Sequence, residues 1–213
     1  MCGIHAVIST TAPAPIEAAF EQRLRNRGPD HVASETIELQ RDDSSRLFVA
    51  LTSTVLSLRG DEITPQPLVD NGSGSVLCWN GEAWKIDGEP VTGNDGKAVL
   101  YHLTQASSSI HEALRSIEGP FAFVFLDKNT STLYYGRDRL GRRSLLSHAT
   151  DSLSLSSVAG TIDPAWTEVE ADGFYSINLA ESGEISTLTR TRHSWTDNEL
   201  AVGAISNQTT PPR

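Results

Sequence analysis

The stretch from Pro120 to Asp138 constrains the fold most, because it has the pattern of two β-strands joined by a short turn. Its first half reads PFAFVFLD and its second half reads STLYYGRD, with Lys128-Asn129 and then Thr130 between them. Aromatic and β-branched runs that flank a short turn predict a β-hairpin. The hairpin indicates that antiparallel sheets form the body of the fold.

Other segments of the chain extend this pattern. Further strands are predicted at 4–8, 47–58, 76–79, 144–158 and 173–190, and helices at 15–27, 97–106 and 110–117. Gly28 stands where a glycine commonly ends a helix, and Asn80-Gly81 is a turn dipeptide directly after a strand. Because strands dominate and helices occur in two places, the sequence predicts an α+β fold in a single domain. The polar tail 207–213, with two prolines, is predicted to fray.

Composition excludes several classes of function. The 213 residues carry a formal net charge of −10, which argues against sequence-independent binding of nucleic acid and against anionic membrane surfaces. No apolar run approaches the roughly 20 residues of a membrane span, and the N-terminus lacks the pattern of a signal peptide. Two cysteines, Cys2 and Cys78, make no disulfide framework, so the cytoplasm is the predicted compartment. The histidines lack metal-ligand spacing, and no metal or cofactor is expected.

Cys2 is the candidate nucleophile. If an aminopeptidase removes Met1, a thiol and a free α-amine lie on one carbon of Cys2. An α-amine titrates near ~7.7–8.0, so part of it is neutral at cellular pH and can accept the proton of the thiol. Met-Cys alone is a weak signal, because many chains begin this way by chance.

Three further segments each allow a structural and a functional interpretation. Arg25 to Asp30 has the pattern of a helix C-terminus with cations against the dipole. Asn80-Gly81 is either a hairpin turn or a pair of donors, the Asn amide and the Gly N–H, that suits an oxyanion hole. Arg137-Asp138-Arg139 is either an internal salt-bridge cluster, which we favour, or a support for a catalytic pocket. Cys78, in a strand with a buried pattern, is predicted to be a core thiol.

Several short segments occur together in a fixed order. They are Met1-Cys2-Gly3-Ile4, Arg27-Gly28-Pro29-Asp30, Asn80-Gly81-Glu82, Gly93-Asn94-Asp95, Gly119-Pro120-Phe121-Ala122-Phe123 and Gly136-Arg137-Asp138-Arg139-Leu140-Gly141. With them the chain resembles the glutaminase domain of class II glutamine amidotransferases. It is most similar to the asparagine synthetase branch. The stretches Val55-Leu56-Ser57-Leu58-Arg59-Gly60, Gln66-Pro67 and Gly141-Arg142-Arg143-Ser144-Leu145-Leu146 look like the asparagine synthetase domain-containing proteins, which it resembles more closely still. The resemblance implies a four-layer αββα N-terminal-nucleophile hydrolase over residues 1–206, followed by the tail.

The resemblance also implies roles for individual residues. Cys2 would attack the side-chain amide of L-glutamine, ammonia would leave, and water would hydrolyse the thioester to glutamate. Asn80 and the N–H of Gly81 would hold the oxyanion. Glu82 and Asp95 would bind the substrate, with Asp95 receiving the α-ammonium group. Such an enzyme belongs to glutamine-dependent asparagine biosynthesis.

The chain departs from this family at two points. Where asparagine synthetases place an arginine for the substrate α-carboxylate, it has Val55. Arg59 either replaces that arginine from another backbone position or is a surface residue. A non-catalytic binding or scaffold module with the same fold therefore stays an alternative, as does a different amide substrate. No pyrophosphate loop of a synthetase domain occurs, so the chain alone is not expected to make asparagine, and a synthetase domain or subunit is an expected partner.

Overall fold

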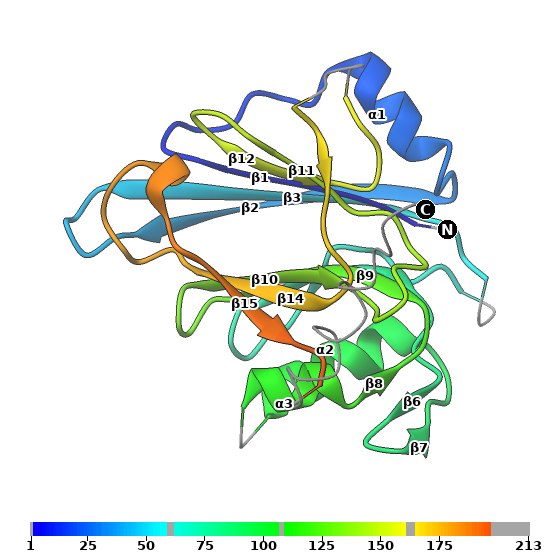
Figure 1. The fold of residues 1–213 in the computed structure, drawn as a ribbon. Coiled ribbons are helices and arrows are strands. Elements are labelled where there is room, and N and C mark those ends of the chain that lie inside the picture. The colour runs from blue at the N-terminus through cyan, green and yellow to red at the C-terminus, as the bar shows by residue number, and fades with distance from the viewer. Residues whose placement is uncertain (1, 59–61, 107–108, 161–164, 197–213) are drawn as a thin grey trace, which may run out of the picture.

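The computed structural model describes residues 2–58, 62–106, 109–160 and 165–196. Four layers make up the molecule: one helix, two six-stranded sheets packed face to face, and a pair of helices (Figure 1). Strands and helices alternate irregularly along the chain, and every strand pair within the two sheets is antiparallel. This is the predicted α+β fold in the predicted αββα order.

The first sheet has the strand order β13-β11-β12-β1-β3-β2. Its strands are β1 (Gly3–Ser9), β2 (His31–Gln40), β3 (Arg46–Val55), β11 (Leu146–Ala149), β12 (Leu153–Ser156) and β13 (Thr167–Glu168). Helix α1 (Ala18–Arg25) covers its outer face, where the helix buries Phe20 and Leu24. Strand β1 therefore runs through the interior of the sheet, between β12 and β3.

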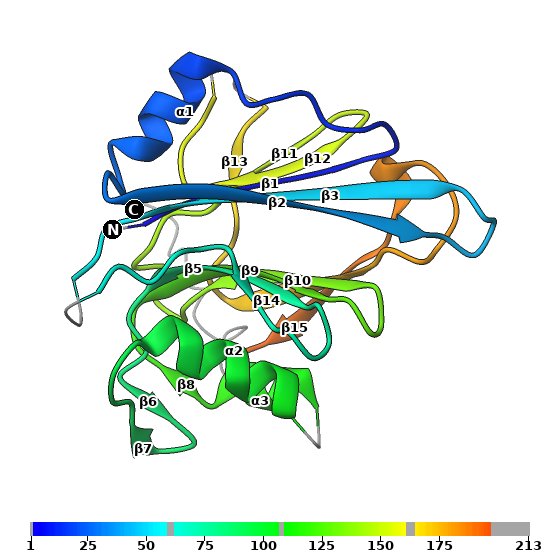
Figure 2. The ribbon, with the colours of Figure 1, turned by 180° about the vertical axis from the view of Figure 1, so that it is seen from behind.

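The second sheet has the order β15-β14-β10-β9-β5-β4. Its strands are β4 (Leu68–Val69), β5 (Val76–Gly81), β9 (Phe121–Asp127), β10 (Thr132–Arg137), β14 (Gly173–Asn178) and β15 (Arg190–Ser194). The predicted hairpin is confirmed: β9 and β10 pair from Thr132 opposite Asp127 to Arg137 opposite Ala122. Figure 2 shows α2 (Asp95–Gln105) and α3 (Ile110–Arg115) on the outer face of this sheet.

Smaller elements complete the described chain. Strands β6 (Lys85–Ile86), β7 (Glu89–Pro90) and β8 (Ile117–Glu118) form a three-stranded sheet in the order β7-β6-β8. A single turn of 3₁₀ helix spans Ile185–Thr187. Among the described residues, no helix combines the length and the apolar character needed to cross a membrane.

Two apolar cores separate the layers. One lies between the sheets and the other lies between the second sheet and α2 and α3. Successive side chains of a strand point to opposite faces, so Val76 and Cys78 of β5 enter the first core while Leu77 and Trp79 enter the second. Cys78 is fully buried, as predicted, and burial raises the pKa of its thiol to about 12. By the same alternation, the next residue on the side of Cys78, Asn80, faces the first sheet.

The turn predicted at Asn80-Gly81 is wrong. Strand β5 continues through Gly81, and Gly81 lies opposite Phe121 on β9. A side chain at position 81 has no room, because a Cβ there would lie 2.4 Å from the carbonyl oxygen of Pro120. The dipeptide is therefore selected by close packing and by its place in the sheet instead of by turn geometry.

The role predicted for Gly28 is also wrong. Helix α1 ends at Arg25 with Asn26 as its C-cap, and Gly28 lacks the positive φ of a helix-ending glycine. Instead, a Cβ on Gly28 would lie 2.5 Å from the carbonyl carbon of Thr54 on β3. Gly28 thus allows the chain after α1 to run against the backbone of β3.

Candidate active site

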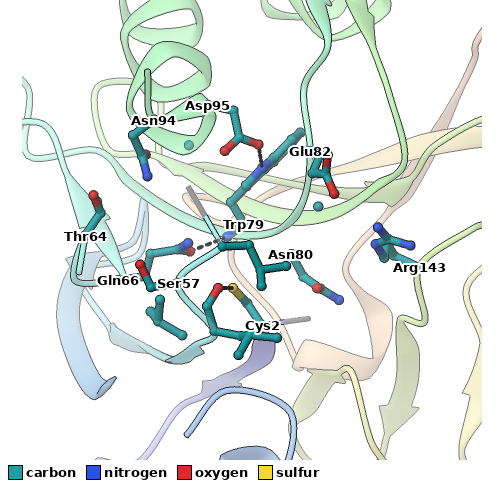
Figure 3. A pocket seen from close by; sticks show the side chains of 15 residues that line it. Cys2, Ser57, Thr64, Gln66, Trp79, Asn80, Glu82, Asn94, Asp95 and Arg143 are labelled. Carbon is teal, nitrogen blue, oxygen red and sulfur yellow. Dashed lines mark hydrogen bonds between the residues drawn. The ribbon is translucent and has the colours of Figure 1, made fainter. Parts of the chain in front are cut away.

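A small pocket of about 70 Å3 opens beside Cys2 (Figure 3). Its walls come from three layers: the first sheet, the second sheet and the start of α2. The residues that line it are Cys2, Val55, Leu56, Ser57, Leu58, Thr64, Gln66, Trp79, Asn80, Gly81, Glu82, Asn94, Asp95, Gly96 and Arg143. Five of the six residues singled out by sequence thus meet in one place, while the sixth, Arg59, lies outside the described residues.

Cys2 immediately precedes β1, and it faces the second sheet. Ile4, Ala6 and Ile8 of β1 enter the core between the sheets, and alternation along the strand places Cys2 on the same side. Its Sγ lies 3.9 Å from the carbonyl oxygen of Leu56, to which the thiol donates. Burial raises the pKa of the Cys2 thiol, so this thiol is protonated at neutral pH and needs a base before it can attack.

The backbone around Cys2 is fixed by two neighbours. The Nε of Arg27 donates to the carbonyl oxygen of Cys2 at 3.3 Å, and the N–H of Gly3 donates to the hydroxyl of Thr54 at 3.1 Å. Arg25 lies in the last turn of α1, as the interpretation of this segment as a helix C-terminus with cations predicts. Arg27 instead contacts the candidate nucleophile, and the signal for this was its place in the Arg-Gly-Pro-Asp segment of the resemblance.

Asp30, the last residue of that segment, ties it to the pocket wall. The Asp30 N–H donates to the carbonyl oxygen of Val55 at 3.0 Å, and its carboxylate accepts from the N–H of Ser57 at 2.8 Å. The chain that leaves β3 is thereby held next to Cys2. This is a structural contribution to the site that the sequence pattern alone did not reveal.

Asn80 brings an unpaired amide to the pocket. It is fully buried, and neither its Oδ1 nor its Nδ2 has a hydrogen-bond partner among the described residues. A buried amide without a partner costs about 1–3 kcal/mol. In Figure 3 its side chain lies beside that of Cys2, so a bound ligand can complete its hydrogen bonds.

The N–H of Gly81 points away from β9. The next backbone N–H, that of Glu82, donates to the carbonyl oxygen of Pro120 at 2.9 Å. Along an antiparallel ladder, hydrogen-bonded residue pairs alternate with pairs that form no hydrogen bonds. Gly81 and Phe121 are therefore a pair without hydrogen bonds. The N–H of Phe121 donates to Asp138 instead, at 3.1 Å. The Gly81 N–H and the Asn80 amide are two donors at one end of β5, next to the thiol.

Asp95 is held rigidly at the start of α2. Its Oδ2 accepts from the Nε1 of Trp79 and from the N–H of Ala83, both at 2.9 Å. Asp95 is 7% exposed, so these hydrogen bonds form in a largely dry environment and orient the carboxylate. With Glu82, Asp95 gives the pocket two acidic side chains, which suits a cationic group on a ligand.

Val55 and Arg143 complete the site. Val55 ends β3 in the pocket wall, is 4% exposed, and offers no charge to a carboxylate. Arg143 also lines the pocket, and the sequence did not predict its presence there. Within the described ranges, no group of three or more His, Cys, Asp or Glu side chains is arranged to hold a metal ion.

The arrangement of the layers is that of the class II glutamine amidotransferases, whose fold is the N-terminal-nucleophile hydrolase sandwich. A glutamine phosphoribosylpyrophosphate amidotransferase from B. subtilis superimposes with a TM-score of 0.62 at 16% identity, over 92% of this chain and 50% of that one. A regulatory enzyme of purine biosynthesis gives a TM-score of 0.61 at 15% identity, over the same fractions. At such identities the similarity establishes the fold.

The family follows from the sequence comparisons: the chain belongs to the glutamine amidotransferase domain family, whose model matches residues 1–186. Asparagine synthetase domain-containing protein 1 of Gallus gallus is 31% identical over 207 residues, which are 92% of this chain and 32% of that protein. Its Homo sapiens counterpart is 31% identical over 84% of this chain and 28% of its own length. A glutamine-hydrolysing asparagine synthetase of Pongo abelii is 25% identical over 71% of this chain and 27% of its own.

These relatives place the chain in the asparagine synthetase branch. The chain spans about a third of the length of the curated relatives that it matches.

Proposed function

We propose that this chain is a glutaminase that hydrolyses L-glutamine to glutamate and ammonia, with Cys2 as its nucleophile after removal of Met1. The observation that carries the proposal is the meeting of the Cys2 thiol, the unpaired Asn80 amide and the outward N–H of Gly81 in one pocket. Membership of the glutamine amidotransferase family supports the choice of glutamine.

In the proposed mechanism the α-amine of Cys2 takes the proton of the thiol, and the thiolate attacks the amide carbon of glutamine. The Asn80 amide and the Gly81 N–H bind the oxyanion of the tetrahedral intermediate. The protonated amine then gives its proton to the leaving nitrogen, which departs as ammonia and leaves a thioester. Water, deprotonated by the same amine, attacks the thioester and releases glutamate.

The raised pKa of the thiol gives the amine its role. Since burial keeps the thiol protonated at neutral pH, an adjacent base is needed, and the amine on the same residue is at hand. Asp95 and Glu82 bind the substrate in this proposal, with Asp95 accepting from its α-ammonium group through a charge-assisted hydrogen bond.

A synthetase domain or subunit is the proposed user of the ammonia, by analogy with the glutamine-hydrolysing asparagine synthetases that this chain resembles over 27% of their length. The cytoplasm stays the compartment that cysteine usage predicts.

A second function, ligand binding without turnover, is favoured by one observation. Val55 lies in the pocket wall where the asparagine synthetase branch is expected to have an arginine, and an aliphatic side chain cannot pair with a carboxylate. A chain with weak affinity for glutamine could retain the fold as an interaction module.

The deciding experiment combines N-terminal mass analysis with a glutaminase assay and labelling by an electrophilic glutamine analogue. We expect a mature protein that begins at Cys2, releases glutamate from glutamine, and is labelled at Cys2. Cys2→Ala should lower turnover by more than about 10³-fold, because the nucleophile and its thioester are lost.

Cys78→Ala is the matched control. Cys78 lies in the core between the sheets and outside the pocket, so this variant should keep its turnover and its label. An intact Met1 on the mature chain, or equal turnover by Cys2→Ala, would exclude the glutaminase and leave the binding module.

A further inference from the structure

The pocket beside Cys2 contains one charged side chain that the mechanism above does not use, that of Arg143. Glu82 and Asp95 provide two acidic side chains, and Arg143 is the one cationic side chain among the described residues that line the pocket. Figure 3 shows Arg143 on the side of Asn80 and Glu82. A substrate with both an ammonium and a carboxylate group needs both signs of charge in its site.

The opposite wall is uncharged. It contains Thr64 and Gln66, and Figure 3 shows both across the pocket from Arg143. Gln66 already accepts from the N–H of Trp79 at 2.9 Å. Near two acidic side chains, neutral donors alone compensate poorly for the charge of a bound carboxylate, since a partly buried anion needs a cationic partner.

The loop that carries Arg143 is fixed in place. The carboxylate of Asp138 is 2% exposed and accepts from the backbone N–H groups of Phe121, Leu140 and Arg142, each at 3.1 Å. It also pairs with the Nε of Arg142 at 2.9 Å. Asp138 thus forms an internal ion pair, as favoured for the Arg137-Asp138-Arg139 segment, and through this loop it also supports the pocket, which was the alternative.

On its other side, Arg143 is followed by two anchored residues. The hydroxyl of Ser144 donates to the carbonyl oxygen of Ser157 at 3.0 Å, and Leu145 is fully buried. The backbone of Arg143 is thus held between two fixed points. A backbone that is already fixed does not have to be ordered when an anion binds, so that part of the entropic cost is avoided.

The guanidinium itself has hydrogen-bonding capacity left. Its Nε is buried without a hydrogen-bond partner among the described residues, and its Nη1 donates to the carbonyl oxygen of Arg142 over a long 3.3 Å. It also lies close enough to Arg27 for its charge to add to burial in lowering the pKa of Arg27. A bound anion would satisfy the donors and relieve this repulsion between like charges.

We propose that Arg143 binds the α-carboxylate of an amino-acid amide in this pocket, where Val55 offers no charge. The proposal rests on the proposed function only in taking an amino-acid amide as the ligand. The ammonium group of the ligand meets Asp95, its carboxylate meets Arg143, and its side-chain amide reaches Cys2. Arg143 is a specificity residue: it selects ligands that carry a carboxylate.

The test measures binding by calorimetry in a Cys2→Ala background, so that it needs no turnover. The two ligands are L-glutamine and 4-aminobutanamide, which is glutamine without its α-carboxylate. We expect Arg143→Gln to weaken glutamine binding by about 10- to 100-fold, as the loss of a charge-assisted bond does, and to leave 4-aminobutanamide unchanged. The glutamine affinity of Arg143→Lys should lie between that of the parent protein and that of Arg143→Gln.

Arg139→Gln is the matched control, because Arg139 is exposed and does not line this pocket. Equal losses for both ligands, no loss for either, absent glutamine binding in the parent protein, or loss on Arg59→Gln in place of Arg143→Gln would each overturn the assignment. Arg143-dependent binding without turnover in the wild type would refute the glutaminase and keep this inference. Turnover whose KM for glutamine is unchanged by Arg143→Gln would keep the glutaminase and refute this inference.

Discussion

At the scale of the residue, Asn80 is the most exacting part of the site. Its amide is fully buried, and its Oδ1 and Nδ2 are without partners in the described part of the chain. The cost of such a group is the desolvation of its donor and acceptor, which no described residue offsets with a hydrogen bond. A ligand oxygen that develops negative charge would offset this desolvation cost most, because that oxygen forms the strongest hydrogen bond with the amide.

We therefore expect Asn80→Ala to lower kcat by about 10²–10³-fold, the usual loss for one oxyanion donor. Thermal stability should fall little, because the substitution also removes two unsatisfied polar atoms from the interior. Steady-state kinetics and a melting curve on the same preparation measure both. Asn129→Ala, at an exposed turn position between β9 and β10, is the control and should match the wild type. A large loss of stability with unchanged kcat would contradict the role of Asn80.

At this scale the sequence predicted most of the pocket. Cys2, Asn80, Gly81, Glu82 and Asp95 lie together as expected, because the ordered segments of the resemblance fix which strand and helix ends carry them. Arg143 escaped prediction for a physical reason. A long arginine side chain can point in many directions, and the Asp138 bonds that fix the backbone of its loop include one to Phe121, which is distant in the sequence.

At the scale of the element, close backbone packing replaces what looked like turn chemistry. Gly28 and Gly81 both lie where a Cβ would strike a neighbouring backbone, at 2.5 and 2.4 Å. Sequence alone could not distinguish this from turn formation, because a glycine satisfies both demands and only the pairing partner tells them apart.

We expect Gly28→Ala to destabilise the protein by about 1–3 kcal/mol or more, because its Cβ would push the segment after α1 away from β3. Denaturant unfolding measures this change. Gly160→Ala is the matched control: a Cβ there would meet its nearest neighbour, Phe20, at an ordinary 3.9 Å, so its midpoint should stay close to that of the wild type. Equal unfolding midpoints for the two variants would show that the backbone near Gly28 shifts to accommodate a Cβ, and would contradict this prediction.

Strand β2 was missed by the sequence analysis, although it pairs with β3 along its whole length, from His31 opposite Val55 to Gln40 opposite Arg46. It lies at the edge of the first sheet, and Leu39 is its one buried residue. Polar residues such as Glu35 and Glu38 protect an edge strand from pairing with other chains. They also hide the apolar alternation by which strands are recognised.

At the scale of the whole molecule, the four layers make stability depend on pH. His5 lies between the first sheet and α1, packs edge-on against Phe20 at 4.6 Å, and leaves its buried Nδ1 without a partner among the described residues. Burial lowers its pKa from 6.5 to about 4. The unfolded chain therefore binds a proton more readily between these values, and stability falls as pH drops from about 6.5 towards 4.

For one proton this slope approaches about 1.4 kcal/mol per pH unit. We expect His5→Leu to remove the contribution of His5 to this pH dependence. The free energies of unfolding measured in urea at pH 5 and pH 7 should then differ less than in the wild type. His193, whose pKa burial also lowers to about 4, will keep part of the dependence. A variant that keeps the full wild-type difference would show that His5 does not carry the effect.

The pocket draws Cys2 from the first sheet, Asn80 from the second and Asp95 from a helix of the outer layer. Along the chain, Cys2 is separated from Asn80 by 78 positions and from Asp95 by 93 positions. Helices and strands that form separately would give a full spectroscopic signal and still leave this pocket unbuilt. The turnover rate would therefore report the fraction of molecules whose layers have docked. Circular dichroism alone would overestimate the active fraction of a preparation.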